Sequence, residues 1–201
     1  MRNDLPISLV LGFIISCGGP SVHVQRVDAG QTTDLSGKWN DTDADLTSRA
    51  LVEQCLTAPW LADFNNAEKR RPVLRVRDIV LKVDEHIDPQ VFIKSIERLL
   101  LNSGKVRVLA QQGAEQASVV KEQAHGQSGL VSADSAPGVG EELGADFVVV
   151  VRMATVLDQT EATRIKLYKI NFELIHSTSG EKVWIGDHQI KKLITQDRIR
   201  P

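Results

Sequence analysis

The sequence is poor in cysteine and in aromatic side chains, and it carries no excess of either charge. Cys17 and Cys55 are its two cysteines, too few for a disulfide scaffold or a four-cysteine zinc site. Lys and Arg number 24 and Asp and Glu 26, so the net charge is -2 and no positive field gathers a polyanion. We therefore expect no nucleic-acid binding, and we expect Cys55 to be a small buried hydrophobe in a helix.

A hydrophobic run long enough to span a bilayer is also missing from the sequence. The apolar stretch at residues 5–16 falls short of the roughly 20 residues that a membrane-spanning helix needs. Its length is typical of the hydrophobic region of a signal peptide. The remaining chain has the composition of a folded protein, since 42% of all residues are hydrophobic and 25% are charged.

The end of this apolar stretch, Ile14-Ile15-Ser16-Cys17, resembles the lipobox of bacterial lipoproteins. The resemblance implies cleavage before Cys17, a diacylglycerol on its sulfur and an acylated amino terminus. Two or three acyl chains form a stable membrane anchor where a single chain is marginal. Because no aspartate follows Cys17, the usual sorting rule implies the outer membrane. An ordinary soluble amino terminus is the alternative.

Three parts are predicted along the chain. Residues 1–16 form a signal peptide, residues 17–34 the lipidated cysteine and a flexible tether, and residues 35–201 one globular domain. The tether is rich in Gly, Ser, Thr, Asp and Gln and lacks apolar periodicity, as surface linkers do. Fully extended, it reaches no more than about 60 Å.

Hydrophobic periodicity predicts an α/β or α+β domain, a small sheet flanked by helices. We expect helices at residues 40–56, 88–102, 115–125 and 132–144, strands at 73–81, 105–110 and 146–157, and a terminal hairpin that turns at 177–180. Pro59 is expected to end the first helix, and Trp60, Leu61 and Phe64 to anchor the connection after it. The nearly unbroken apolar run at 146–157 predicts a central strand covered on both faces.

None of the motifs that we weighed predicts catalysis. The run 126–129 (GQSG) is one residue short of a nucleophile elbow, and 138–144 is one residue too long for a dinucleotide-binding fingerprint. Pairing of the terminal hairpin sets His176 opposite Lys182 and His188 opposite Ile170, roughly 20 Å apart, so the two histidines do not share a metal ion. We predict no enzymatic activity, no metal site and no cofactor.

One cluster of cations is the first candidate for a contact with a partner. Lys69, Arg70 and Arg71 lead into the strand expected from residue 73, whose polar face carries Arg75 and Arg77. Up to five cations then share one surface of a protein that is acidic overall. A charged edge strand that resists aggregation is the alternative interpretation.

Several segments are similar to a known family. They are residues 33–43 (TDLSGKWNDTD), 59–61 (PWL), 70–73 (RRPV), 97–98 (ER), 102–108 (NSGKVRV), 141–146 (EELGAD) and 179–186 (SGEKVWIG). Together they extend over about residues 34–194 and resemble the LpoB-like lipoproteins, activators of peptidoglycan synthases. The resemblance implies a fold like the amino-terminal domain of TolB, a small mixed sheet packed with helices.

The resemblance also implies a function. A member of this family is an outer-membrane lipoprotein without enzymatic activity that binds a non-catalytic docking module of a bifunctional class A penicillin-binding protein. Binding activates the synthase by shifting it toward a more active conformation. The alternative is a structural or secretion-associated outer-membrane lipoprotein with a TolB- or CsgG-like interaction domain and no activating role. Only Cys17 takes its role from a motif match; the five cations are our own candidates.

Overall fold

The computed structural model describes residues 25–28, 31–32, 34, 36–77, 79–128, 130, 132, 144–160 and 162–195. The chain divides into two compact units, residues 1–31 and 32–201. The expected signal peptide and Cys17 lie outside the described residues, as does the helix expected at 132–144 apart from its two end residues. The second unit contains every described helix and strand.

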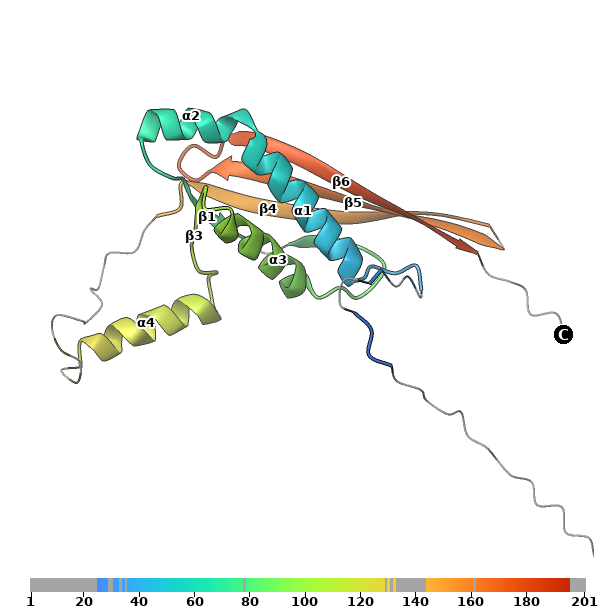
Figure 1. The fold of residues 1–201 in the computed structure, drawn as a ribbon, viewed down its shortest axis with the longest axis horizontal. Helices are drawn as coiled ribbons and strands as arrows, with labels where there is room; N and C mark the ends of the chain where they lie inside the picture. Colours follow the sequence, from blue (N-terminus) through green and yellow to red (C-terminus); the bar gives the residue numbers. More distant parts are fainter. Residues whose placement is uncertain are drawn as a thin grey trace, which may run out of the picture. The chain divides into compact units, whose positions relative to one another are not determined.

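A mixed six-stranded sheet forms the second unit, with the strand order β3-β1-β4-β5-β6 and with β2 paired to β4 beyond the end of β1 (Figure 1). The strands are β1 (Val73–Val76), β2 (Val80–Lys82), β3 (Arg107–Val108), β4 (Phe147–Gln159), β5 (Thr163–His176) and β6 (Lys182–Thr195). The short strands pair in parallel, whereas β4, β5 and β6 form a long antiparallel ribbon. The predicted α/β class with a small mixed sheet is confirmed.

The helices described are α1 (Asp41–Thr57), α2 (Pro59–Glu68), α3 (Pro89–Asn102) and α4 (Ala114–Gly126). Helices α1 and α3 pack on each other and lie on one face of the sheet (Figure 1). Their side chains bury the alternate residues of β4 and β5 in one apolar core. Its fully buried members include Leu51, Ile93, Ile96, Leu100, Val149, Val151, Ile170 and Phe172. Burial of side chains of this size stabilises the fold by about 1.5–3 kcal/mol each.

Side-chain caps define where the two core helices begin. The Asn40 side chain accepts a hydrogen bond from the backbone N–H of Asp43, and the Asp43 carboxylate accepts one from the N–H of Asn40, which completes a capping box. The Asp88 carboxylate caps α3 at 2.9 Å from the N–H of Gln90, and Pro89 opens that helix. Such caps contribute about 1 kcal/mol each, and they confirm the predicted starts of both helices.

The expected end of the first helix before Pro59 is confirmed, but the connection expected after it is wrong, because residues 59–68 form a helix. Proline stops α1, but it is also the first residue of α2, a position where its missing N–H costs no hydrogen bond. Trp60 and Leu61 are buried as expected, yet they anchor a helix and not a loop. This helix ends at Lys69, whose backbone adopts the left-handed conformation at φ 54°.

The strand expected at residues 73–81 is interrupted. Its two halves, β1 and β2, both pair with β4, while the chain between them leaves the ladder after the N–H of Arg77 donates to the carbonyl of Val149 at 3.0 Å. In the terminal hairpin His188 lies opposite Ile170 as predicted. A register shift after Leu174 sets Lys182 opposite Ile175 and not opposite His176 as predicted. The prediction missed this shift because the alternation of side chains does not encode a bulge.

Strand β4 is central in the sheet, as predicted, but it is not covered on both faces. Phe147, Val149 and Val151 are buried under the helices, whereas Val148 and Val150 on the other face are only partly buried. The described helices α1 and α3 lie on a single face, so the expectation of two covered faces is wrong for the described residues. An apolar run cannot by itself distinguish a doubly covered strand from one with a half-open apolar face.

Candidate functional site

Two of the family-like segments meet at one end of the sheet, where residues 70–73 contact Asp146. The two terminal guanidinium nitrogens of Arg70, Nη1 and Nη2, donate to the Asp146 carboxylate at 2.7 Å, and the N–H of Val73 donates to the same carboxylate at 2.8 Å. The Asp146 carbonyl accepts the N–H of Ser177 from the turn between β5 and β6 at 2.8 Å. One residue thereby joins the end of α2, the start of β1 and the terminal hairpin.

The protonation of Asp146 is tied to this arrangement. The hydrogen bonds from Arg70 hold the pKa of the Asp146 carboxyl below its usual value, against the opposing effect of its partial burial. The Arg70 guanidinium also lies 5.1 Å from the centre of the Phe64 ring, within reach of a cation–π contact. Arg70 is therefore part of the frame of this end of the domain.

Beside Asp146 a groove of about 620 Å³ opens between α2 and the β5–β6 turn. Phe147 lies at its centre, with edge-to-face contacts to the rings of Trp60, Phe64 and His176 at centroid distances of 5.3, 5.4 and 5.4 Å. The Trp60 indole N–H donates to the Cys55 carbonyl at 2.7 Å, which fixes α2 on the end of α1. The groove is therefore lined by an interlocked set of aromatic rings.

Trp184 forms part of the lining of the groove, and its position depends on Gly186. A Cβ atom at residue 186 would lie 2.4 Å from Cη2 of Trp184, closer than any side chain allows. The absent side chain therefore gives the indole ring its space, and the ring packs edge-to-face on Phe172 at 5.7 Å. This explains the spacing of Trp and Gly in the segment 179–186.

Sequence reasoning missed the groove as a unit, although the chain holds only nine aromatic residues: three Trp, one Tyr and five Phe. Four of them line it: Trp60, Phe64, Phe147 and Trp184. Trp60 and Phe64 were expected to be buried anchors, and Trp184 was noted only within a segment. The available signal is that these four aromatic residues fall inside or within a few positions of the family-like segments. Their convergence depends on the strand order.

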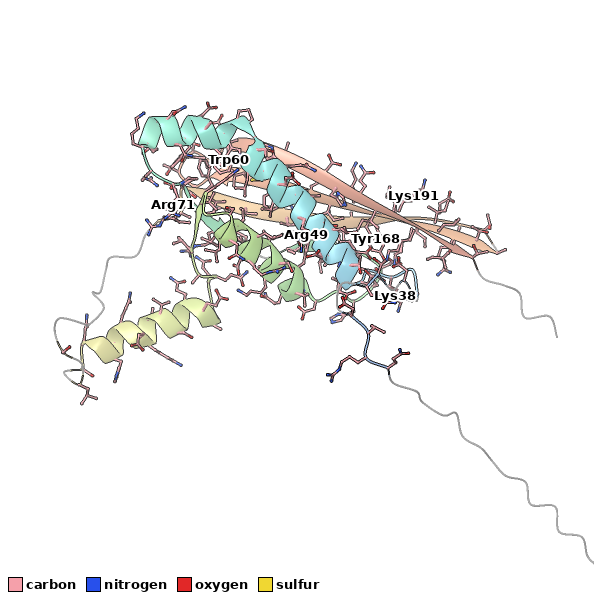
Figure 2. The ribbon with its side chains drawn as sticks, viewed as in Figure 1. Lys38, Arg49, Trp60, Arg71, Tyr168 and Lys191 are labelled. Carbon is pink, nitrogen blue, oxygen red and sulfur yellow. The ribbon has the colours of Figure 1, made fainter. Side chains whose placement is uncertain are left out.

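The five candidate cations have different surroundings. Arg70 pairs with Asp146, and Arg71 donates to the Gly104 carbonyl at 3.1 Å, so both guanidinium groups hold neighbouring segments together. Lys69, Arg75 and Arg77 make no side-chain hydrogen bond or ion pair within the described part of the chain. Figure 2 labels Arg71 and Trp60 near this end of the sheet.

A second charged cluster lies toward the other end of the β5–β6 ribbon, where Lys166 and Lys192 stand directly opposite each other. Lys192 is buried, and its ammonium group lies 2.6 Å from the Asp43 carboxylate and 2.8 Å from that of Asp34. It also donates to the Lys38 carbonyl at 2.9 Å. These bonds lower the pKa of Asp34 and raise the pKa of Lys192.

Lys166 has its own pair of acids. Its ammonium group lies 2.9 Å from Asp84 and 3.3 Å from Glu85, and it lowers the pKa of Asp84. Glu85 also accepts hydrogen bonds from the Tyr168 hydroxyl and from the Trp39 backbone N–H. Asp34 and Asp43 thus hold the chain before and at the start of α1 on the sheet through paired charges, and the Trp39 ring lies 5.3 Å from the Tyr168 ring. Figure 2 labels Lys38 and Tyr168 near this cluster.

The described residues contain no cluster of three or more His, Cys, Asp or Glu side chains with the geometry of a metal site. Burial raises the pKa of the Cys55 thiol to about 12, so this cysteine is a protonated core side chain at neutral pH. No helix in the described ranges is long and apolar enough to cross a membrane. The groove and the two charged clusters are the candidate functional features of the described residues.

The chain was compared with known families and structures. Residues 43–190 match the family model described as peptidoglycan-synthase activator LpoB. No curated protein sequence matches the chain. Among solved structures, the LpoB C-terminal domain from Salmonella enterica has 17% identity and a TM-score of 0.43, with 77% of this chain and 99% of that chain covered. The corresponding domain from Escherichia coli has 16% identity and a TM-score of 0.41, with coverages of 75% and 99%.

The NMR structure of Escherichia coli LpoB has 13% identity and a TM-score of 0.41, with 96% of this chain and 91% of that chain covered. The family model extends over well more than half of the sequence, from the first turn of α1 into β6. The chain therefore belongs to the LpoB family of peptidoglycan-synthase activators.

Proposed function

We propose that this protein is an outer-membrane lipoprotein that binds and activates a bifunctional class A penicillin-binding protein, and that it has no catalytic activity of its own. The observation that carries the proposal is the match of residues 43–190 to the family of peptidoglycan-synthase activators. Activation then results from tighter binding to the more active conformation of the synthase, since a regulator shifts an equilibrium only through differential affinity.

The membrane anchor in this proposal is a lipid on Cys17, based on the lipobox at residues 14–17. Residues 17–34 serve as the tether on the periplasmic face of the outer membrane. The bond between Asp34 and Lys192 supports this boundary, because it fastens the chain to β6 where the tether is expected to end. Replacing Cys17 by Ser should leave the protein unlipidated, and retention of that variant in the membrane fraction would contradict the anchor.

The cations at the start of β1 remain our candidates for contact with the synthase docking module. Lys69, Arg75 and Arg77 are the members whose side chains are not engaged within the described part of the chain. Arg70 and Arg71 contribute by fixing the backbone around them through Asp146 and Gly104. Positive side chains on a rigid frame favour contact with an acidic partner surface and raise the rate of association.

The test is to measure binding and polymerisation together. The full-length protein in detergent is mixed with each class A penicillin-binding protein of its own organism, and the affinity and the rate of glycan polymerisation are recorded in the same samples. Binding that accelerates polymerisation is the expected result. Failure to bind any of these synthases would refute the activator role and favour the structural or secretion-associated alternative.

A further inference from the structure

We propose that the groove between α2 and the β5–β6 turn binds a segment of a partner protein in which a large apolar side chain is flanked by lysine or arginine. The proposal concerns a site separate from the cations at the start of β1, and it does not depend on synthase activation. It rests on the apolar lining of the groove, on the charges at its border and on the rigidity of its frame.

The lining of the groove suits one large apolar side chain. Phe147 and Trp60 are nearly fully buried beneath it, while Phe64 and Trp184 are only partly buried and offer ring surface to an occupant. A volume of about 620 Å³ accommodates an aromatic or aliphatic side chain together with parts of its neighbours. Removing such a side chain from water is the main source of affinity in a pocket of this kind.

The charges at the border of the groove specify what flanks that side chain. Asp63 on α2 and Glu181 beside the turn come from the two elements that border the groove, and neither carboxylate has a hydrogen bond or ion pair within the described part of the chain. Lys182, the one Lys or Arg among the residues lining the groove, is paired with Glu173 at 3.0 Å, and Arg70 beside the groove is paired with Asp146. The charged side chains that line the groove without a partner are therefore both negative. This favours a basic occupant and disfavours an acidic one.

The frame of the groove is held in place without an occupant. Phe147 packs against three rings, and the Trp60 indole N–H is bonded to the Cys55 carbonyl. The turn is fixed by the Ser179 N–H, which donates to Nδ1 of His176 at 3.2 Å. Binding then requires little ordering of the protein, so more of the contact free energy contributes to affinity.

A protein segment fits these features better than a glycan. A pyranose ring binds through open aromatic faces and through polar groups that reach its hydroxyls. In this groove the partly exposed Phe64 and Trp184 rings offer apolar surface to either ligand, but the indole N–H of Trp60 is already bonded to backbone and is not free for a sugar hydroxyl. The unpaired groups that remain are carboxylates, which pair best with ammonium or guanidinium groups.

The test uses a fluorescent nonapeptide, Gly-Ser-Gly-Lys-Trp-Lys-Gly-Ser-Gly, and the full-length protein in detergent, with binding measured by fluorescence anisotropy. We expect saturable binding, and we expect about tenfold weaker binding when both lysines are replaced by glutamate or the tryptophan by glycine. The double variant Asp63→Asn/Glu181→Gln should weaken binding of the first peptide by a similar factor. The control Glu53→Gln/Asp158→Asn removes one glutamate and one aspartate charge from other exposed positions and should leave binding unchanged.

Equal affinity for the three peptides, or binding that the Asp63→Asn/Glu181→Gln variant leaves intact, would overturn the proposal. Binding of chitotetraose without binding of the lysine–tryptophan peptide would overturn it in favour of a glycan. Amide replacements at exposed carboxylates preserve shape, and an unchanged thermal midpoint verifies that the variant is folded. Synthase stimulation is measured separately, so its absence counts against the activator role and leaves the peptide result to decide this proposal.

Discussion

The two ends of the β4–β5–β6 ribbon use charge in opposite ways. Around Lys192 the charges are buried and paired, and they bind the segment before α1 to the sheet. Around the groove the buried groups are aromatic, and two carboxylates at the border, Asp63 and Glu181, lack a partner within the described ranges. Buried, paired charges hold the chain together, whereas unpaired charge beside apolar surface is available to a partner.

The largest effect is expected from removing the buried cation at the Lys192 end of the ribbon. Lys192→Met leaves the Asp43 carboxylate buried without its ammonium partner, and we expect a loss of about 3 kcal/mol in the free energy of unfolding. Urea denaturation measures the loss. Lys191→Met changes the neighbouring exposed lysine and should cost less than about 0.5 kcal/mol. Equal effects of the two variants would contradict the assigned role of Lys192.

A smaller effect is expected at the groove. Gly186→Ala forces the Trp184 ring from its place, and overpacking of this kind costs about 1–3 kcal/mol. The change in tryptophan fluorescence and the thermal midpoint report the displacement. Gly144→Ala is the matched control, because a Cβ atom there meets no atom within 4 Å. A variant at residue 186 with native fluorescence and stability would show that the glycine does not position the indole.

The pairing of Asp146 with Arg70 makes the stability of the domain depend on pH in acid. The pKa of this carboxyl is lower in the folded protein than in the unfolded chain. Its contribution to the free energy of unfolding is therefore complete above the pKa of the unfolded chain, about 3.9, and is lost as the pH falls through the pKa of the folded protein. We expect the wild type to lose stability between pH 5 and strongly acidic solution, about pH 2, more than Asp146→Asn does. Chemical denaturation at the two pH values measures the difference. Identical pH dependence of the two proteins would contradict the pairing with Arg70.

The smallest effect on stability is expected for the cations of β1. Arg75→Glu/Arg77→Glu should change the thermal midpoint little, since neither side chain has an ion pair within the described part of the chain, while binding to the synthase weakens by about tenfold. Lys121→Glu/Arg164→Glu reverses two exposed charges elsewhere and serves as the control. Unaltered affinity of the first variant would dismiss these cations as contacts.

Much of the local structure could be predicted from the sequence. Helices α1, α3 and α4 follow from periodicity and from caps such as Asn40 and Asp88, which act within one turn of the chain. The pairing of His188 with Ile170 follows from counting outward from the turn. The helical role of Pro59 could not be distinguished from a simple stop, because proline both ends one helix and begins another.

The candidate site was less predictable because its parts are distant in the chain. Trp60 and Trp184 meet around Phe147 only after the strand order brings β5 and β6 beside β4. Lys192 is next to exposed Lys191 in the sequence. Lys192 is a buried partner of Asp43 because its side chain lies on the face of β6 that the start of α1 covers. The alternation of side chains tells which residues share the buried face once the strand register is known. The register itself depends on tertiary pairing.

The bond between Asp34 and Lys192 has a mechanical consequence. Tension on a membrane anchor before residue 34 would act first on the bonds of the Asp34 carboxylate to Lys192 and Asn40 and on the bond of the Lys38 carbonyl, and only then on Trp39, which packs against the core. Rupture of these three bonds would release the chain before Trp39 and lengthen the tether by about 15 Å while the sheet stays folded. Under load, the junction between anchor and domain would thus extend before any part of the sheet unfolds.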